Sequence, residues 1–332
     1  MHAAVHPHRP ARWRERHPRL VRVLTVAFLL VVASLLVLMA RRVQWDEVGT
    51  ALLRYDRGLL AGAATLAALS YAIYSCYDLL SRHYVRHALP RRLTVAIAFV
   101  SYAFNLNMGA LVGGVGFRVR LYSQFGLKAA AISRIVALSI TTNWLGYVAV
   151  AGLCFVAGLV PVPDEWRLGA AGFRVLGAAL LAVAAGYLAA CAFSPRRELN
   201  VRGHEIALPS WRVGLLQLAL GATNWLLLGA IVWLLLQREA PYAHVLAVLL
   251  AGAIAGAITH IPAGLGALEA VFVALLGDTL GTGTVLAALL AYRAIYYLAP
   301  LLVAVPTYVV LERIAKSHPR KRRSPNKGDG AH

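Results

Sequence analysis

The stretch THIPAGLGALEA, residues 259–270, interrupts a long apolar run with a proline, two glycines, a histidine and a glutamate. Proline and glycine break helices, and a charged side chain is costly inside a bilayer. A second break, NLNMGALVGGVG at residues 105–116, is rich in glycine and asparagine. The meaning of both breaks depends on whether the runs around them cross a membrane.

The composition indicates that they do. Of the 332 residues, 60% are hydrophobic and 14% are charged, whereas soluble domains carry about 25% charged residues. Six runs reach the roughly 20 apolar residues that span a bilayer core: 20–40, 58–80, 129–158, 171–193, 211–236 and 283–311. The sequence therefore predicts an all-α polytopic membrane protein of the bacterial inner membrane.

The net charge of +19 lies mainly at the chain ends and in short loops. In a soluble protein this charge would suggest nucleic acid, but beside a membrane basic clusters bind anionic headgroups and set topology. We expect the membrane and anionic phospholipids as partners, and no nucleic acid. The three cysteines fall within apolar runs, without paired spacing. We therefore expect no metal site, no cofactor and no catalytic residue.

Lysine and arginine gather in the cytoplasmic loops of membrane proteins. The two tails and the loops 81–92, 118–128 and 194–212 hold 23 of them, whereas the loops 41–57, 159–170, 237–242 and 278–282 hold six. With the first group inside, both termini are cytoplasmic. Residues 93–117 and 243–277 must then enter the membrane and return to the side from which they came.

These returning stretches contain the two breaks. Each arm of the first has about 12 residues, near 18 Å of helix, which is shorter than the roughly 30 Å core. We expect six full transmembrane helices and two re-entrant hairpins, arranged as an inverted repeat of residues 20–158 and 171–311 within one domain, 20–312. Basic tails, 1–19 and 313–332, flank this domain. The alternative is eight full spans.

Four motifs resemble a known family. They are SYAFNLNMGALVGGVGFRVRLYSQFGL (101–127), LSITTNWLGY (138–147), HIPAGLGALEAVFVALL (260–276) and LLAYRAIYYLAPLL (289–302). They are similar to the YbhN-type inner-membrane proteins, relatives of the flippase-like transmembrane domain of lysylphosphatidylglycerol synthases. The resemblance implies a protein that handles lipid. Because only a basic tail follows residue 312, we do not expect aminoacyl transfer.

The first break supplies candidates for holding a lipid phosphate. Arg118 and Arg120 would lie at its cytoplasmic mouth, aided by exposed backbone N–H groups of the neighbouring glycines. The alternative is that these arginines only fix topology. Asn105 and Asn107 could satisfy the broken backbone or face a substrate. The motif TNW, which occurs at 142–144 and 223–225, is more typical of helix packing.

The second break combines three possible roles for Glu269. It could cap the returning helix, pair with Arg293 in the last span, or form a proton couple with His260. Asp78 is a second possible partner for Arg293. The candidate substrate-binding residues are Asn105, Asn107, Gly113, Gly114, Arg118, Arg120, Tyr122, Asn143, His260, Pro262, Gly264, Gly266, Glu269, Arg293, Tyr296 and Tyr297.

Three functions fit this pattern. The first is a lipid transporter or flippase that moves an anionic or modified phospholipid across the inner membrane. The second is a membrane enzyme acting on a lipid-linked substrate, against which the sequence shows no metal-ligand or nucleophile constellation. The third is a carrier of a small solute or ion, because a fold does not determine its cargo.

Overall fold

The computed structural model describes residues 55–162, 169–194, 198–201, 204–259 and 266–317, with a few isolated positions before 55. The labelled elements belong to one unit, Asp46–His332. The predicted first span, 20–40, lies almost wholly outside the described residues. The same is true of three predicted site residues, His260, Pro262 and Gly264.

Long helices account for most of the described chain, as the apolar runs predicted. They are α4 (Arg57–Val85), α7 (Ala129–Val156), α8 (Gly169–Phe193), α9 (Trp211–Leu235) and a last segment formed by α12 (Thr282–Tyr292), η3 (Arg293–Leu298) and α13 (Ala299–Ser317). Within the described residues, these five segments are long and apolar enough to cross a membrane. They match five of the six predicted spans, and the sixth stays a prediction. The polytopic helical fold is confirmed.

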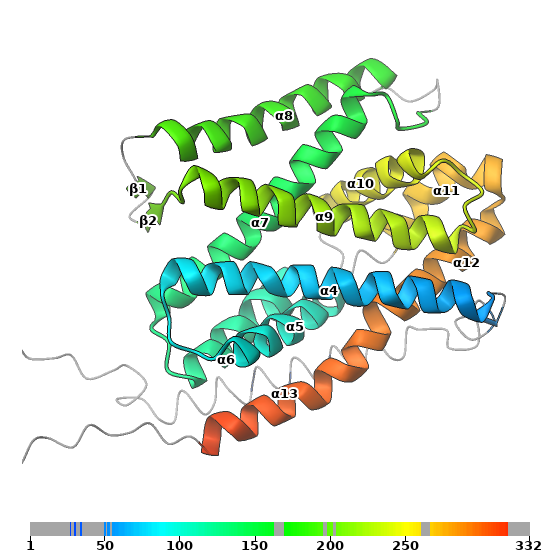
Figure 1. The fold of residues 1–332 in the computed structure, drawn as a ribbon. Coiled ribbons are helices and arrows are strands. Elements are labelled where there is room, and N and C mark those ends of the chain that lie inside the picture. The colour runs from blue at the N-terminus through cyan, green and yellow to red at the C-terminus, as the bar shows by residue number, and fades with distance from the viewer. Residues whose placement is uncertain are drawn as a thin grey trace, which may run out of the picture. The chain divides into compact units, whose positions relative to one another are not determined.

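Both breaks form helical hairpins. The first consists of α5 (Arg91–Met108), the π-helical turn η1 (Ala110–Gly116) and α6 (Phe117–Gln124). The second consists of α10 (Tyr242–Thr259) and α11 (Ala267–Leu280). In each hairpin the two arms pack against each other, and the two hairpins enter the bundle from opposite ends (Figure 1). In the first hairpin the chain turns back at Gly109.

Glycines allow the arms of the first hairpin to approach closely. Gly109 adopts a φ of +83° at the turn, a conformation that L side chains rarely adopt. A Cβ on Gly113 would lie 2.1 Å from the carbonyl oxygen of Phe104 on the opposite arm. The N–H groups of Gly113 and Gly114 donate to the carbonyl of Gly109, at 2.9 and 3.4 Å. The prediction that these N–H groups are exposed to a phosphate is therefore wrong, because the tight turn uses them.

The arms of the first hairpin are also longer than predicted. Helix α5 has 18 residues, and η1 and α6 add 7 and 8 in the returning arm. The charge count had assigned Arg118 to a cytoplasmic loop. Instead, Arg118 lies within α6 and is buried. The helix can continue because the arginine finds its counter-ion inside the protein.

That counter-ion is Asp78 on α4. The Arg118 Nη2 atom lies 3.1 Å from Asp78 Oδ1, with the two side chains 4% and 0% exposed. Tyr122 donates to the other carboxylate oxygen at 2.8 Å, and Arg118 also donates to Ser139 on α7. The predicted location of Arg118 at the hairpin's mouth is wrong. The residue anchors the hairpin to two spans instead.

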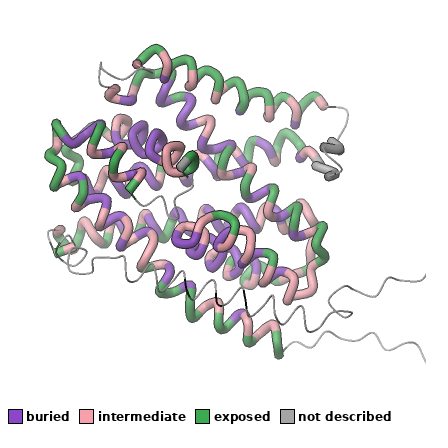
Figure 2. Tube along the Cα trace, turned by 180° about the vertical axis from the view of Figure 1, so that it is seen from behind, coloured by how far each residue is buried: buried purple, intermediate pink, exposed green. Residues whose placement is uncertain are grey.

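Helices α4, α7 and α9 pack together in the centre of the bundle. Glycine again sets the closest approach, because a Cβ on Gly146 of α7 would lie 2.0 Å from the carbonyl carbon of Gly221 on α9. Small residues at such crossings are typical of membrane helices. Helix α8 packs on α7 and α9, and much of its surface is exposed (Figure 2). Two short antiparallel strands, β1 (Glu198–Val201) and β2 (His204–Ala207), connect α8 to α9 and were not predicted.

The hairpin arrangement makes a prediction about sidedness. Lys128 lies in the connection between α6 and α7, and Glu239 in the connection between α9 and α10. Figure 1 shows these two connections at opposite ends of the bundle. In a chain with its three cysteines replaced, we expect Lys128→Cys and Glu239→Cys to react with an impermeant maleimide from opposite sides of the membrane. Both positions are exposed. Labelling of both from one side would contradict the arrangement.

The buried ion pair makes a second prediction. Asp78→Asn leaves Arg118 with a charge that nothing balances at this position, a loss that typically costs about 3–5 kcal/mol. We expect a markedly lower midpoint of thermal unfolding in detergent. The double variant Asp78→Asn with Arg118→Gln removes both charges and should recover much of that loss. A single variant as stable as the original chain would show that the pair does not anchor the hairpin.

Candidate functional site

A cavity of about 300 Å³ lies between the two hairpins. The first hairpin contributes the end of α5 and the start of η1 through Asn105, Leu106, Gly109 and Ala110. The second contributes small residues of α10 and one residue of α11: Gly252, Ala253, Gly256, Ala257 and Leu268. The cavity is therefore lined by both hairpins, which enter the bundle from opposite ends.

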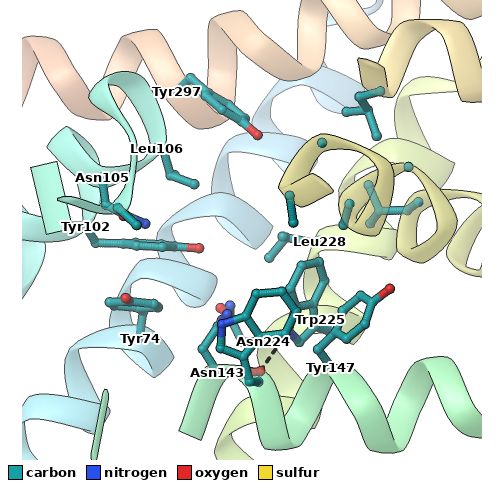
Figure 3. A pocket seen from close by; sticks show the side chains of 18 of the residues that line it. Tyr74, Tyr102, Asn105, Leu106, Asn143, Tyr147, Asn224, Trp225, Leu228 and Tyr297 are labelled. Carbon is teal, nitrogen blue, oxygen red and sulfur yellow. Dashed lines mark hydrogen bonds between the residues drawn. The ribbon is translucent and has the colours of Figure 1, made fainter. Parts of the chain in front are cut away.

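The remaining lining residues come from the spans and from both hairpins, and most of them carry aromatic or amide side chains. They are Tyr74 of α4, Tyr102 of α5, Asn143, Trp144 and Tyr147 of α7, Asn224, Trp225 and Leu228 of α9, Leu249 of α10, Tyr292 of α12 and Tyr297 of η3. Figure 3 shows the stacked rings of Tyr74 and Tyr102 on one side and Trp225 with Tyr147 on the other. Among the described residues that line the cavity, none is charged.

The repeated TNW motif contributes to this lining from both copies. Asn143 and Asn224 both line the cavity, and Trp225 Nε1 donates to the backbone carbonyl of Asn143 at 3.2 Å (Figure 3). The sequence interpretation favoured helix packing, and of the two copies it selected only Asn143 as a site residue. The second copy was the signal that could have identified Asn224 and Trp225. The structure thus gives the motif both a packing contact and a place at the cavity.

The sequence left two roles open for the asparagines of the first break, namely bonding the broken backbone or facing a substrate, and the structure places the two residues differently. Asn105 lines the cavity. Asn107 is buried and donates to the carbonyl of Ala103 at 2.7 Å and to that of Tyr297 at 3.2 Å. Asn107 therefore ties the hairpin to the last span. Tyr297 receives this bond at its backbone while its ring lines the cavity.

The π-helical turn η3 is a feature that the sequence did not predict. Such turns are frequent at functional sites. Here η3 holds Tyr297 at the cavity, whereas Tyr296 is fully buried behind it. The Tyr296 hydroxyl lies 2.7 Å from both the Ser70 and the Tyr102 hydroxyl, and Ser70 donates to Asn224 at 2.6 Å. This chain of hydrogen bonds connects α4, α5, α9 and η3 around the cavity.

Glu269 performs two of its three predicted roles at once. Its Oε1 atom lies 2.5 Å from Arg293 Nε, and its Oε2 atom accepts a bond from the backbone N–H of Gly266 at 3.0 Å. Gly266 adopts a φ of +86°, as expected of a glycine where the chain reverses. Glu269 is therefore both the helix cap and the partner of Arg293. The proton couple stays a prediction, because His260 lies outside the described residues.

Arg120 is paired as well. Its Nε atom lies 2.7 Å from both the Tyr308 hydroxyl and Glu312 Oε1 on α13, and Gln124 donates to the same carboxylate at 2.8 Å. Each of the three predicted arginines therefore contacts a carboxylate. Substrate binding by these residues stays a prediction. The cavity lining that the sequence missed includes six aromatic residues: Tyr74, Tyr102, Trp144, Tyr147, Trp225 and Tyr292.

Comparison with known proteins agrees with this architecture. Residues 24–304 match the family described as the lysylphosphatidylglycerol synthase transmembrane region. The chain is 48% identical to inner membrane protein YbhN of Escherichia coli over 304 residues, which is 90% of this chain and 96% of the relative. It is also 30% identical to the uncharacterized protein slr0712 of Synechocystis, over 84% of this chain and 88% of the relative. The protein is a multi-pass protein of the inner membrane, and it belongs to the family of the lysylphosphatidylglycerol synthase transmembrane region.

Proposed function

We propose that this protein moves an anionic or modified phospholipid between the leaflets of the inner membrane, with the headgroup passing through the cavity between the hairpins. The observation that carries the proposal is the cavity's position between two broken helical hairpins that enter from opposite ends. Secondary transporters use this plan, with the substrate site near the membrane midplane where discontinuous helices meet. Membership of a family defined on a lipid-modifying synthase supports a lipid as cargo.

The size and chemistry of the cavity suit a headgroup. Its volume of about 300 Å³ is at the small end for ligand sites. Such a space holds a polar headgroup while the acyl chains stay in the bilayer. The amides of Asn105, Asn143 and Asn224 offer donors and acceptors, and the aromatic rings offer flat apolar walls. A headgroup crossing the apolar layer needs such partners, because unmet polar groups cost several kcal/mol each.

We infer that both termini are cytoplasmic, with six full spans. The loops 86–90 and 125–128, the last turn of α8 and the first turn of α9 lie at one end of the bundle (Figure 1). These loops belong to the segments that are rich in lysine and arginine, and the positive-inside rule assigns them to the cytoplasm. Residues 20–40 would supply the sixth span. The second hairpin then enters from the outer side and the first from the cytoplasm.

Transport, rather than catalysis, is the activity we infer. A membrane enzyme acting on a lipid-linked substrate would convert it, and a small-solute carrier would move a cargo without acyl chains. All three would use the same cavity. A reconstituted system with a fluorescent phospholipid distinguishes them, because only a lipid transporter changes the leaflet of an unmodified lipid.

Blocking the cavity should stop transport. Ala253 lines the cavity from α10, so an indole introduced by Ala253→Trp fills much of the space. Ala179 on α8 is exposed at the edge of the bundle, and Ala179→Trp is the matched control. The assay uses liposomes that carry a headgroup-labelled phospholipid and an impermeant reductant, which quenches label only in the outer leaflet. With the original chain or Ala179→Trp, we expect label from the inner leaflet to reach the outer leaflet and be quenched. With Ala253→Trp, only the protein-free rate should be seen.

Both variants must be folded, as judged by a single monodisperse peak in size-exclusion chromatography. Normal lipid movement by folded Ala253→Trp would reject the cavity as the path. An unmodified protein that moves no lipid but releases an altered lipid product would favour the enzyme. Transport of a soluble solute alone would favour the carrier.

A further inference from the structure

The cavity poses an electrostatic problem for an anionic headgroup. A phosphate taken out of water needs a cation, because an unpaired buried charge is costly. None of the described lining residues is charged. Arg293 is the arginine that lies behind the Tyr297 part of the wall. Its guanidinium carbon is 5.6 Å from the centroid of the Tyr297 ring.

Arg293 is not among the described lining residues, but the Tyr297 ring that lies against it lines the cavity, as does its sequence neighbour Tyr292. Figure 3 shows Tyr297 with its hydroxyl directed into the cavity. A rotation of this ring would bring a ligand in the cavity within reach of the guanidinium.

In the structure, the Glu269 carboxylate contacts the guanidinium of Arg293. Carboxylate and phosphate are alternative acceptors for the same planar set of arginine N–H groups. The two oxygens of Glu269 have separate partners, since Oε1 contacts Arg293 and Oε2 accepts from Gly266. Loss of the arginine contact would therefore leave the carboxylate with its backbone partner at the start of α11.

The other two ion pairs are less suited to exchange. The carboxylate of Asp78 is 0% exposed and accepts from both Arg118 and Tyr122. Glu312 is 13% exposed and accepts from Arg120, Gln124 and Tyr308. Glu269, at 22%, is the most exposed of the three carboxylates.

We propose that Arg293 binds the phosphate of the lipid headgroup, and that Glu269 holds this position in the empty protein and is displaced when the phosphate binds. The inference rests on the proposed function and names the residues that select an anionic substrate. Exchange of one anion for another keeps the arginine paired throughout, which avoids the cost of an uncompensated charge in the bundle. Glu269 acts as an internal competitor of the substrate.

Competition predicts that removing the carboxylate tightens binding. Glu269→Gln keeps an oxygen that can accept from Gly266 but loses the negative charge. Trp225 and Trp144 line the cavity, so intrinsic fluorescence of the purified full-length protein in detergent can report binding. We expect Glu269→Gln to bind short-chain phosphatidylglycerol about tenfold more tightly than the original chain, equivalent to about 1.4 kcal/mol.

Controls isolate the effect. Glu312→Gln makes the same chemical change in a pair that does not border the cavity lining, and its affinity should be unchanged. Glu269→Gln combined with Arg293→Gln should lose the gain. Short-chain diacylglycerol, which has no phosphate, should bind the original chain and Glu269→Gln equally. Inorganic phosphate, tested in parallel, distinguishes a lipid headgroup from a free anion. If Glu269→Gln binds inorganic phosphate more tightly but not phosphatidylglycerol, the exchange at Arg293 is supported and its ligand is a soluble anion.

An unchanged or weaker affinity of folded Glu269→Gln for both phosphate ligands would overturn the proposal. Should that variant not fold, Arg293→Gln alone decides: phosphatidylglycerol binding must fall while diacylglycerol binding stays the same, and an unchanged phosphatidylglycerol affinity would overturn it. The proposed function is tested separately by lipid movement. If the original chain transports lipid but Glu269→Gln does not bind phosphate ligands more tightly, the exchange is rejected and the proposed function stands. If Glu269→Gln binds them more tightly but the original chain moves no lipid, the proposed function is rejected and the exchange stands.

Discussion

The structure depends on one constraint, namely that polar groups inside the apolar layer must find their partners within the protein. A bilayer core offers no water to the ends of a broken helix. The two hairpins break their helices inside the bundle and therefore require internal partners. In the first hairpin, the Gly109 carbonyl accepts hydrogen bonds from the N–H groups of Gly113 and Gly114, and the Asn107 side chain donates to two backbone carbonyls. In the second, the Gly266 N–H donates to Glu269.

Charged side chains inside the bundle also have their partners within the protein. Arg118 joins the first hairpin to α4, Arg120 joins it to α13, and Glu269 joins the second hairpin to η3. Each hairpin is thus attached through charged groups to a span from elsewhere in the chain. Each of these arginines contacts a carboxylate, and none of the described residues that line the cavity between the hairpins is charged. Charge at the cavity must therefore come from a ligand or from the rearrangement of one of these ion pairs.

Close backbone approach complements these pairs. Glycine at positions 113, 146 and 221 brings the arms of the first hairpin together and lets α7 cross α9. Near the crossing of α7 and α9, Trp225 of one TNW motif bonds Asn143 of the other, and Tyr102 of the first hairpin stacks on Tyr74 of α4. The cavity lies among these packed elements. Its location between hairpins that enter from opposite ends is the basis for interpreting the protein as a transporter of lipid.

The sequence by itself determined the helical membrane class, five segments in the described residues that are long and apolar enough to cross a membrane, and both helical hairpins. These features follow from the length of apolar runs, the positions of arginine and lysine, and the helix-breaking residues, all of which are local properties. It also predicted that Arg293 needs a partner and suggested Glu269. Tertiary structure decided which charges meet: Asp78 pairs with Arg118 across 40 positions of sequence, which moves Arg118 from a loop to the interior. It also decided which side chains face the cavity, such as Asn105 and Asn224, because that depends on helix rotation and crossing, which no local pattern specifies.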